Sequence, residues 1–382
     1  MRIFINTANN LTGGSLQVAI SFITECKNFP ENTYIVVLGT NIEKEINKQS
    51  FPKNFLFYKV ESAPFYKLSA KLSKIEKAEK PNVVFTVFGP SYWRPKCKHI
   101  MGFANPYYGR KSSYIDGLKL KEKIILRLKQ FLHTWYINRD ADLIISETNE
   151  ASEAFKQTFK KVKLFEVVSN NCSNFYWEYK KNHVLKKIPK KEFKLLTLSN
   201  YRPNKNMECI PKIIEELHKV NVTDVKFILT INEGIFKEKF SAYKDIINLG
   251  PQAANKCPEL YEQCDAMFLP TYLECFSASY PEAMIMEKPI LTSDLGFAHD
   301  ICRDAAVFFN PDNPKDIAEK ILSLKNSDDL YEALVKKGLD RLQSFPIPIE
   351  KTKKILTIIV ENSGISNSVL KNSSAAGKQC KG

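Results

Sequence analysis

The stretch that decides the fold reads Pro270-Thr-Tyr-Leu-Glu274-Cys-Phe-Ser-Ala-Ser-Tyr-Pro-Glu282-Ala-Met, with seven residues between its two glutamates. The apolar segment 266–270 predicts a strand before it, and 281–287 predicts a helix after it. Glu274 is therefore expected on a strand-to-helix loop and Glu282 in the first turn of the helix. Helix N-termini attract anions, so the pattern predicts an anion site between the two carboxylates.

The same alternation of strand and helix extends through the whole chain. The expected strands are 2–6, 34–38, 82–88, 143–146, 164–168, 194–199, 226–231, 246–249, 266–269, 289–292 and 306–309. Helical patterns fill most of the gaps, for example at 16–26, 206–219 and 314–325. Nearly continuous apolar strands that alternate with helices are typical of parallel sheets covered on both faces.

At 382 residues the chain is too long for one ordinary core, so two domains are expected. We place them at 1–185 and 192–345. The polar, lysine-rich segment 179–191 is the expected linker. Residues 363–382 are rich in Ser, Asn, Gly and Lys and are expected to be disordered.

Charge is distributed unevenly between the two halves. Residues 1–190 carry 31 Lys and Arg against 16 Asp and Glu, whereas residues 191–382 carry 25 against 26. The positive excess therefore lies in the first half, which predicts an anionic partner there. An anionic membrane leaflet, a lipid-linked diphosphate and nucleic acid all fit the charge, but no nucleic-acid-binding motif is present.

Other features indicate a cytoplasmic location. No apolar run approaches 18 residues, and the N-terminus lacks the apolar core and cleavage site of a signal peptide. The nine cysteines are scattered and odd in number, which is typical of free thiols in a reducing compartment.

The stretch with the two glutamates resembles the E-x7-E region of retaining glycosyltransferases of group 1, also called family 4, which have the GT-B fold. Segments 249–270, 282–293 and 300–311 resemble the parts of that family on either side of it. The resemblance implies an α/β architecture of two Rossmann-like, doubly wound parallel-sheet domains that face a central cleft. It also implies that a helix at about 349–361 crosses back to the first domain.

The resemblance implies a role for each residue of the motif. Glu282 would accept hydrogen bonds from the donor's ribose hydroxyls, and Glu274 would face the donor sugar. The donor's phosphate or sugar would meet the backbone amides of Phe276, Ser277 and Ala278. The simpler alternatives are a solvated first-turn glutamate and an ordinary loop charge. The family commonly has glycine where Ser277 stands, so the pocket is expected to differ there.

A pair of cations should follow the first strand of the second domain and neutralise the donor diphosphate. Lys205 aligns with the family's lysine. The arginine slot falls on Asn200, and we assign Arg202, two residues later, to the same task. Together with Glu274, these two residues are the predicted catalytic group. The alternative is a basic turn that precedes a helix.

Further donor contacts are predicted from weaker patterns. The turn Gly13-Gly14-Ser15 resembles the family's glycine pair after the first strand, although an ordinary turn with Ser15 as helix cap is an equal alternative. Gly250 falls in the family's glycine loop. Many relatives have a histidine after the strand near residue 100; here Asn105 stands nearest to that place, and we expect His99 to precede the strand.

No metal or other cofactor is expected. Asp140-Ala-Asp142 imitates a D-x-D metal motif, but it precedes the expected strand 143–146 and matches a structural segment of GT-B relatives. The histidines show no metal-ligand spacing.

Segment 119–136 predicts a basic amphipathic helix. Positions 124, 128, 131 and 135 form one apolar stripe, which 125 and 132 widen, with lysines and Arg127 on its flanks. Such a helix can lie in a membrane interface or pack its apolar face on the core.

The function expected from the resemblance is transfer of a sugar, with retention of configuration, from a nucleoside-diphosphate-sugar to an acceptor hydroxyl. A glycan or lipid-linked acceptor in bacterial cell-surface polysaccharide assembly suits the basic first half, which could contact the inner face of the cytoplasmic membrane peripherally. Two alternatives stay open: a non-catalytic, membrane-associated partner with the same fold, and a nucleotide-sugar 2-epimerase.

Overall fold

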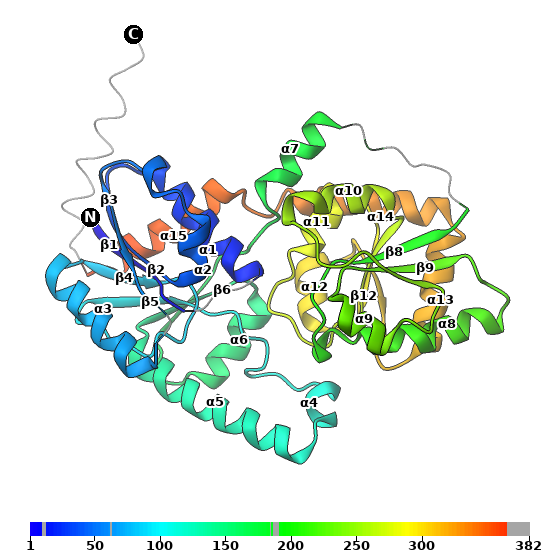
Figure 1. Cartoon of the computed structure of the whole chain (residues 1–382), viewed down its shortest axis with the longest axis horizontal. Coiled ribbons are helices and arrows are strands. Elements are labelled where there is room, and N and C mark those ends of the chain that lie inside the picture. Colours follow the sequence, from blue (N-terminus) through cyan, green and yellow to red (C-terminus); the bar gives the residue numbers. More distant parts are fainter. Residues whose placement is uncertain (10–12, 62, 184, 186–190, 365–382) are drawn as a thin grey trace, which may run out of the picture.

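The computed structural model describes residues 1–9, 13–61, 63–183, 185 and 191–364, and shows two parallel sheets, each flanked by helices (Figure 1). The first sheet has seven parallel strands in the order β3-β2-β1-β4-β5-β6-β7. These strands are β1 (Arg2–Thr7), β2 (Thr33–Leu38), β3 (Phe55–Lys59), β4 (Val83–Thr86), β5 (Lys98–Gly102), β6 (Leu143–Ser146) and β7 (Leu164–Val167).

The second sheet has six parallel strands in the order β10-β9-β8-β11-β12-β13. Its strands are β8 (Phe193–Thr197), β9 (Val225–Leu229), β10 (Ile246–Asn248), β11 (Ala266–Leu269), β12 (Ile290–Ser293) and β13 (Val307–Phe309). Each unit is a doubly wound α/β domain, and the two face one another as the GT-B fold requires. The predicted fold class is confirmed.

Helices cover both faces of each sheet. Those that precede β8 in the chain are α1 (Gly14–Glu25), α2 (Thr40–Glu45), α3 (Phe65–Glu79), α4 (Ser113–Gly117), α5 (Leu120–Asp140), α6 (Asn149–Thr158) and α7 (Asn174–Asn182). The later ones are α8 (Ile210–Lys219), α9 (Glu233–Lys239), α10 (Cys257–Gln263), α11 (Ser279–Ile285), α12 (Gly296–Cys302), α13 (Pro314–Lys325), α14 (Asp328–Leu342) and α15 (Pro348–Glu361).

The central strands form because long apolar runs are buried on both faces. Residues Tyr34–Leu38 of β2 are all fully buried, and so is the core of β1 beside it. A strand that lies between two helix layers has no polar face, which explains its lack of period-2 alternation.

The last helix returns to the first domain. Ile355, Leu356 and Ile359 of α15 belong to the same apolar core as β1 and α1. The chain therefore passes between the domains twice, before α7 and before α15. The two passing segments are joined, because Asn171 Nδ2 donates to the carbonyl oxygens of Phe345 and Pro346 at 3.4 and 3.2 Å.

Several expected elements differ in detail from those observed. The pattern analysis missed β3, and it placed His99 before a strand, which is wrong because His99 lies inside β5. The helix expected at 206–219 begins at Ile210, after a short 3-10 turn. The chain crosses to the second domain before α7, which packs on the second-domain core, so the expected linker at 179–191 and the boundary at 185 are placed too late in the chain. Residues 184 and 186–190 of that segment and 365–382 of the expected tail lie outside the described residues.

Candidate active site

Two loops at the carboxyl ends of neighbouring strands β8 and β11 are bound tightly to each other. The carbonyl oxygen of Asn204 accepts from Thr271 Oγ1 at 3.0 Å and from the Tyr272 amide at 2.9 Å. Asn204 Nδ2 donates in return to the Leu273 carbonyl at 3.2 Å. These bonds fix the turn before Lys205 against the loop before Glu274, so the side chains of both residues start from a rigid frame.

Lys205 and Glu274 form an ion pair in that frame. Their side chains are only 14% and 15% exposed, so the pair is largely removed from solvent. The structure thus brings together two of the three residues predicted to be catalytic. A cation held beside a carboxylate at the carboxyl end of a parallel sheet can bind an anion while the carboxylate accepts from hydroxyl groups.

Backbone donors lie just after Glu274. Within the described residues, no acceptor is bonded to the backbone N–H groups of Phe276, Ser277 and Ala278, the last residues before α11. Unbonded amides at a helix start favour negative charge. The three amides are therefore hydrogen-bond donors without an acceptor in the described part of the chain.

Glu282 lies among tyrosine side chains. Tyr261 Oη donates to Glu282 Oε2 at 3.2 Å, and Tyr176 is a second hydrogen-bond partner. Burial raises the pKa of Glu282 to about 7, and the two tyrosines oppose that shift. A carboxylate that is only half ionised near neutral pH is stabilised by any further donor, such as a pair of hydroxyls.

The first domain contributes two tyrosines, Tyr107 and Tyr114, which we call the aromatic wall. Tyr114 stacks on Tyr272 of the second domain, with ring centroids 6.1 Å apart. Burial raises the pKa of Tyr107 to about 12, with smaller influences from Tyr114, Arg202 and Glu274. Tyr107 therefore lies within electrostatic reach of both Arg202 and Glu274. Arg202 itself is exposed, and it is not part of the Lys205–Glu274 ion pair.

Cys275, next to Glu274 in the chain, joins the domains. Its carbonyl oxygen accepts from Thr148 Oγ1 at 3.2 Å, and its sulfur accepts from Arg110 Nη1 at 3.6 Å. Arg110 is held in turn by an ion pair with Glu150. The loop that carries Glu274 is therefore docked on the first domain through Cys275, which the sequence analysis did not single out.

A second group that the sequence analysis missed is Glu147, at the carboxyl end of β6. Burial raises its pKa, while Lys351 lowers it and Glu274 raises it further. Burial lowers the pKa of Lys351, on α15, to about 8, and its Nζ donates to Asn170 Oδ1 at 2.7 Å. Asn170 and Glu147 are also hydrogen-bonded. The place of Glu147 directly after a strand is the sequence signal that could have found it.

The residues predicted from weaker patterns lie in several different places. Gly13, with φ of 56°, precedes α1, and a Cβ at Gly13 or Gly14 would meet open space. The amide of Ser15, in the first turn of α1, lies close by. Asn105 lies two residues before Tyr107 of the aromatic wall, and we call this segment the aromatic-wall loop. Asn105 Oδ1 accepts from the Tyr107 amide at 3.2 Å. Gly250 follows the edge strand β10, and within the described part of the chain no hydrogen bond joins it to the paired loops.

The D-x-D sequence lies at the opposite ends of the strands from the cleft. Asp140 is buried and paired with Arg139, with Oδ1 and Nε 2.5 Å apart, while Asp142 Oδ2 accepts from the His99 amide at 2.9 Å. The His99 ring is buried too, between Thr86 and the Asp140 carbonyl. Among the residues that the structure describes, no group of three or more His, Cys, Asp or Glu is arranged to hold a metal ion.

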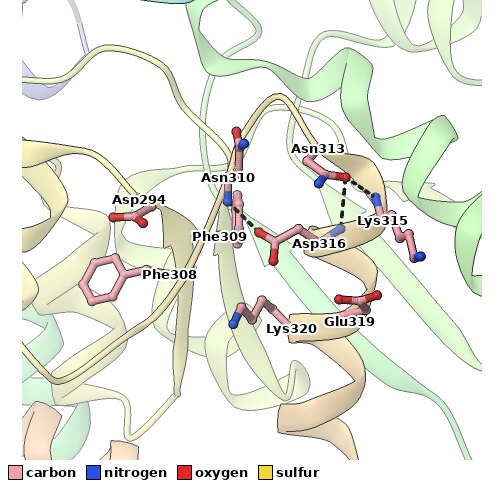
Figure 2. Close-up of a pocket in the computed structure, with 9 residues that line it drawn as sticks. All are labelled: Asp294, Phe308, Phe309, Asn310, Asn313, Lys315, Asp316, Glu319 and Lys320. Carbon is pink, nitrogen blue, oxygen red and sulfur yellow. Dashed lines mark hydrogen bonds between the residues drawn. The ribbon is translucent and has the colours of Figure 1, made fainter.

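A polar pocket of about 520 Å³ lies elsewhere, beside β13 and α13 (Figure 2). Backbone N–H groups at the start of α13 already have an acceptor, because Asn313 Oδ1 accepts from the Lys315 and Asp316 amides at 3.2 Å. Asp316 Oδ2 accepts from the Asn310 amide at 2.7 Å. The pocket offers mixed, solvated charges, and we assign it no role.

Comparisons with known proteins give a family for part of the chain and a fold for the whole of it. Residues 178–341 match the family described as glycosyl transferases group 1. No curated protein matches the sequence. A glycosyltransferase from Rickettsia africae is similar in structure, with 16% identity, a TM-score of 0.69 and 96% and 99% of the two chains covered.

Two further solved structures share the fold. Anabaena HepE in complex with UDP and glucose has 13% identity, a TM-score of 0.65 and coverage of 94% of this chain and 100% of that one. Sucrose-phosphate synthase from Thermosynechococcus elongatus has 11% identity, a TM-score of 0.69 and coverage of 94% and 98%. The second domain matches the group 1 glycosyltransferases in sequence, and the chain as a whole shares the GT-B fold of these solved structures.

Proposed function

We propose that the protein transfers a hexose from a nucleoside-diphosphate-sugar to an acceptor hydroxyl with retention of configuration, as family 4 enzymes do. The observation that carries the proposal is the buried Lys205–Glu274 pair next to the unbonded amides of Phe276–Ala278. This arrangement offers a cation and dipoles to a diphosphate, and a carboxylate to sugar hydroxyls. Such a match to charge on the leaving group is the main source of catalysis in transfers of this kind.

In the proposed reaction, the bond between the sugar's anomeric carbon and the phosphate oxygen breaks. The acceptor oxygen bonds to the same face of that carbon, and its proton passes to the departing phosphate. Lys205 and the amides stabilise the diphosphate as it gains charge, and Glu274 holds the sugar. The exposed Arg202 contacts the diphosphate from the cleft mouth. No protein nucleophile or metal ion is needed in this scheme, because protein cations and amides neutralise the leaving group.

The donor is proposed to be a UDP-sugar. Several structures with the same fold are bound to such molecules, namely HepE with UDP-glucose and an E. coli trehalose-6-phosphate protein with UDP-2-fluoro glucose. Glu282 would accept from both ribose hydroxyls, and Gly13, Gly14, Ser15, Asn105 and Gly250 would line the remainder of the donor site.

The acceptor is proposed to be a glycan or lipid-linked sugar of bacterial surface-polysaccharide assembly. The positive excess of residues 1–190 supports an anionic acceptor on that side of the cleft. The enzyme would then work at the inner face of the cytoplasmic membrane. No helix in the described residues is long and apolar enough to cross a bilayer, so contact with the membrane would be peripheral.

The test is a thermal-shift and hydrolysis screen of nucleoside-diphosphate-sugars with the wild type, Glu282→Ala and Glu319→Ala. Glu319 is an exposed glutamate of α13 and serves as the matched control. We expect one donor to stabilise and be hydrolysed by the wild type and the control but not by Glu282→Ala. Binding without turnover, even with membrane extract as the acceptor source, would favour a non-catalytic partner. Formation of an epimerised sugar nucleotide would favour an epimerase.

A further inference from the structure

Helix α5 turns its polar side toward the protein. Gln130 Nε2 donates to the Tyr107 carbonyl at 2.5 Å. The His133 ring is hydrogen-bonded on both nitrogens, with Tyr108 Oη 2.7 Å from Nδ1 and Tyr92 Oη 2.9 Å from Nε2. Of its 21 residues, only Ile137 and Asp140 are buried. The helix is thus anchored through hydrogen bonds and its last turns, rather than by an apolar face.

The apolar side of α5 faces solvent instead. Leu128, Phe131 and Trp135 are 60%, 70% and 52% exposed. The same exposed stripe includes Leu120, Ile124, Ile125 and Leu132. We call these seven residues the α5 stripe. At 1.5 Å per residue, a helix of this length is about 30 Å long, so the stripe is far larger than the scattered single exposures found on ordinary surfaces.

Aromatic contacts continue the stripe onto α3. Trp135 packs on Tyr136 with ring centroids 4.8 Å apart, and Tyr136 packs on Phe65 at 6.0 Å. Phe65 is itself 53% exposed. Aromatic side chains at the boundary of an apolar surface are typical of proteins that sit in the headgroup region of a bilayer.

Positive charge surrounds the stripe. The exposed basic residues on α5 and at its start are Lys119, Lys121, Arg127 and Lys129, and Glu122 is the exposed acid among them. Two copies of such a face, brought together by two-fold symmetry, would place like charges side by side. An anionic surface, by contrast, complements the rim while it covers the apolar centre.

We propose that the α5 stripe is a membrane-docking surface, which lies in the headgroup region of an anionic bilayer with the helix parallel to the membrane. This inference deepens the membrane part of the proposed function by naming the surface that makes the contact. The helix lies along the outer edge of the first domain (Figure 1). Its inward face holds the aromatic-wall loop through Tyr107 and Tyr108, so docking would set the first-domain side of the cleft close to the membrane.

The experiment is co-sedimentation of the full chain with vesicles of phosphatidylcholine alone or mixed with phosphatidylglycerol. The variants are Phe131→Asp, Trp135→Asp and the triple change of Lys121, Arg127 and Lys129 to Gln. Val220→Asp is the control, because Val220 is 57% exposed at the end of α8 in the other domain. We expect the wild type to prefer anionic vesicles, and each aspartate variant to lose about tenfold or more in affinity. The triple variant should lose the salt dependence of binding, and the control should bind as the wild type does.

Trp135 gives an independent readout. The other two tryptophans are the buried Trp93 and the partly buried Trp177 of the second-domain core, so a blue shift of tryptophan emission on vesicle addition that disappears in Trp135→Phe reports insertion of α5. Vesicle binding that is absent, or that survives the α5 substitutions, overturns the inference. So does a wild-type dimer that the same substitutions dissociate. Hydrolysis of the soluble donor should persist in every α5 variant. Its absence in the wild type, with vesicle binding intact, would remove the proposed function and leave the docking surface in place.

Discussion

Arg110 of the first domain directs Nη1 at the sulfur of Cys275 in the second, 3.6 Å away, while its Nε donates to Glu150 Oε1 at 2.8 Å. A single guanidinium therefore connects the loop that holds Glu274 to the opposite wall of the cleft. The Arg110 side chain is only 6% exposed. Its buried positive charge is therefore stabilised by these partners rather than by water.

Replacing Arg110 should therefore weaken both the fold and the docking of the domains. Arg110→Gln leaves Glu150 without its cation, which should lower the free energy of unfolding by about 3 kcal/mol. Lys156→Gln, which breaks an exposed pair with Glu153, should cost less than about 1 kcal/mol. Urea unfolding, followed by fluorescence, measures both. Equal effects of the two substitutions would show that the cross-domain contact adds nothing.

The Lys205–Glu274 pair should matter to turnover more than to folding. Lys205→Met and Glu274→Gln should each lower kcat for donor hydrolysis by about 100-fold or more, because Lys205 stabilises charge on the leaving diphosphate and Glu274 positions the sugar. Lys256→Met, which breaks an exposed pair with Glu259, is the control. Steady-state kinetics separates kcat from KM. A change confined to KM would assign the pair to binding alone.

Glu282 should make stability depend on pH. Its pKa rises from 4.5 to about 7 on folding. The folded state therefore keeps a proton that the unfolded chain releases, and the stability that this proton contributes is lost as pH rises through about 7. Glu282→Gln should remove that loss. Relative to the wild type it should gain about 1 to 3 kcal/mol between about pH 4.5 and pH 8.

The same substitution should abolish the pH dependence of donor binding. The ionised carboxylate is the better acceptor for ribose hydroxyls, so the wild-type affinity should rise from about pH 6 to about pH 8. Calorimetric titration of UDP and thermal unfolding at both pH values measure the two effects, with Glu319→Gln as the control. A variant that is no more stable than the wild type at the higher pH contradicts the burial argument.

Glu147 should act on transfer rather than on donor binding. It lies on the first-domain side of the cleft, with Lys351 and Asn170 as neighbours and Glu274 within electrostatic reach. Glu147→Gln keeps the hydrogen-bonding shape and removes the charge. Transfer of labelled sugar to a membrane extract should fall by about tenfold or more, while the thermal shift given by the donor stays unchanged. A parallel loss of donor binding would move Glu147 to the donor site.

Local features made most of the second-domain site predictable. The strand, loop and helix around Glu274 and Glu282 are contiguous in the chain, so their order sets their positions. Lys205 follows a strand adjacent to β11, and adjacent parallel strands bring their carboxyl ends together. The roles assigned to these residues stay predictions until the variants are measured.

Contacts between the domains were not predictable in this way. Cys275 and Arg110 are 165 residues apart, and no periodicity relates them. The amphipathic pattern of α5 was recognised, but the direction of its apolar face was not. Packing on the core is the commoner use of such a face, and here hydrogen bonds from Gln130 and His133 occupy the inner side instead.

The Asn171 bonds to Phe345 and Pro346 have a mechanical consequence. They hold the two chain crossings side by side, and two adjacent tethers resist twisting of one domain against the other. Opening of the cleft would therefore pivot near Asn171, where the two crossings are joined. Contacts far from that pivot separate most for a given angle, so they set how wide a molecule the enzyme can admit or release.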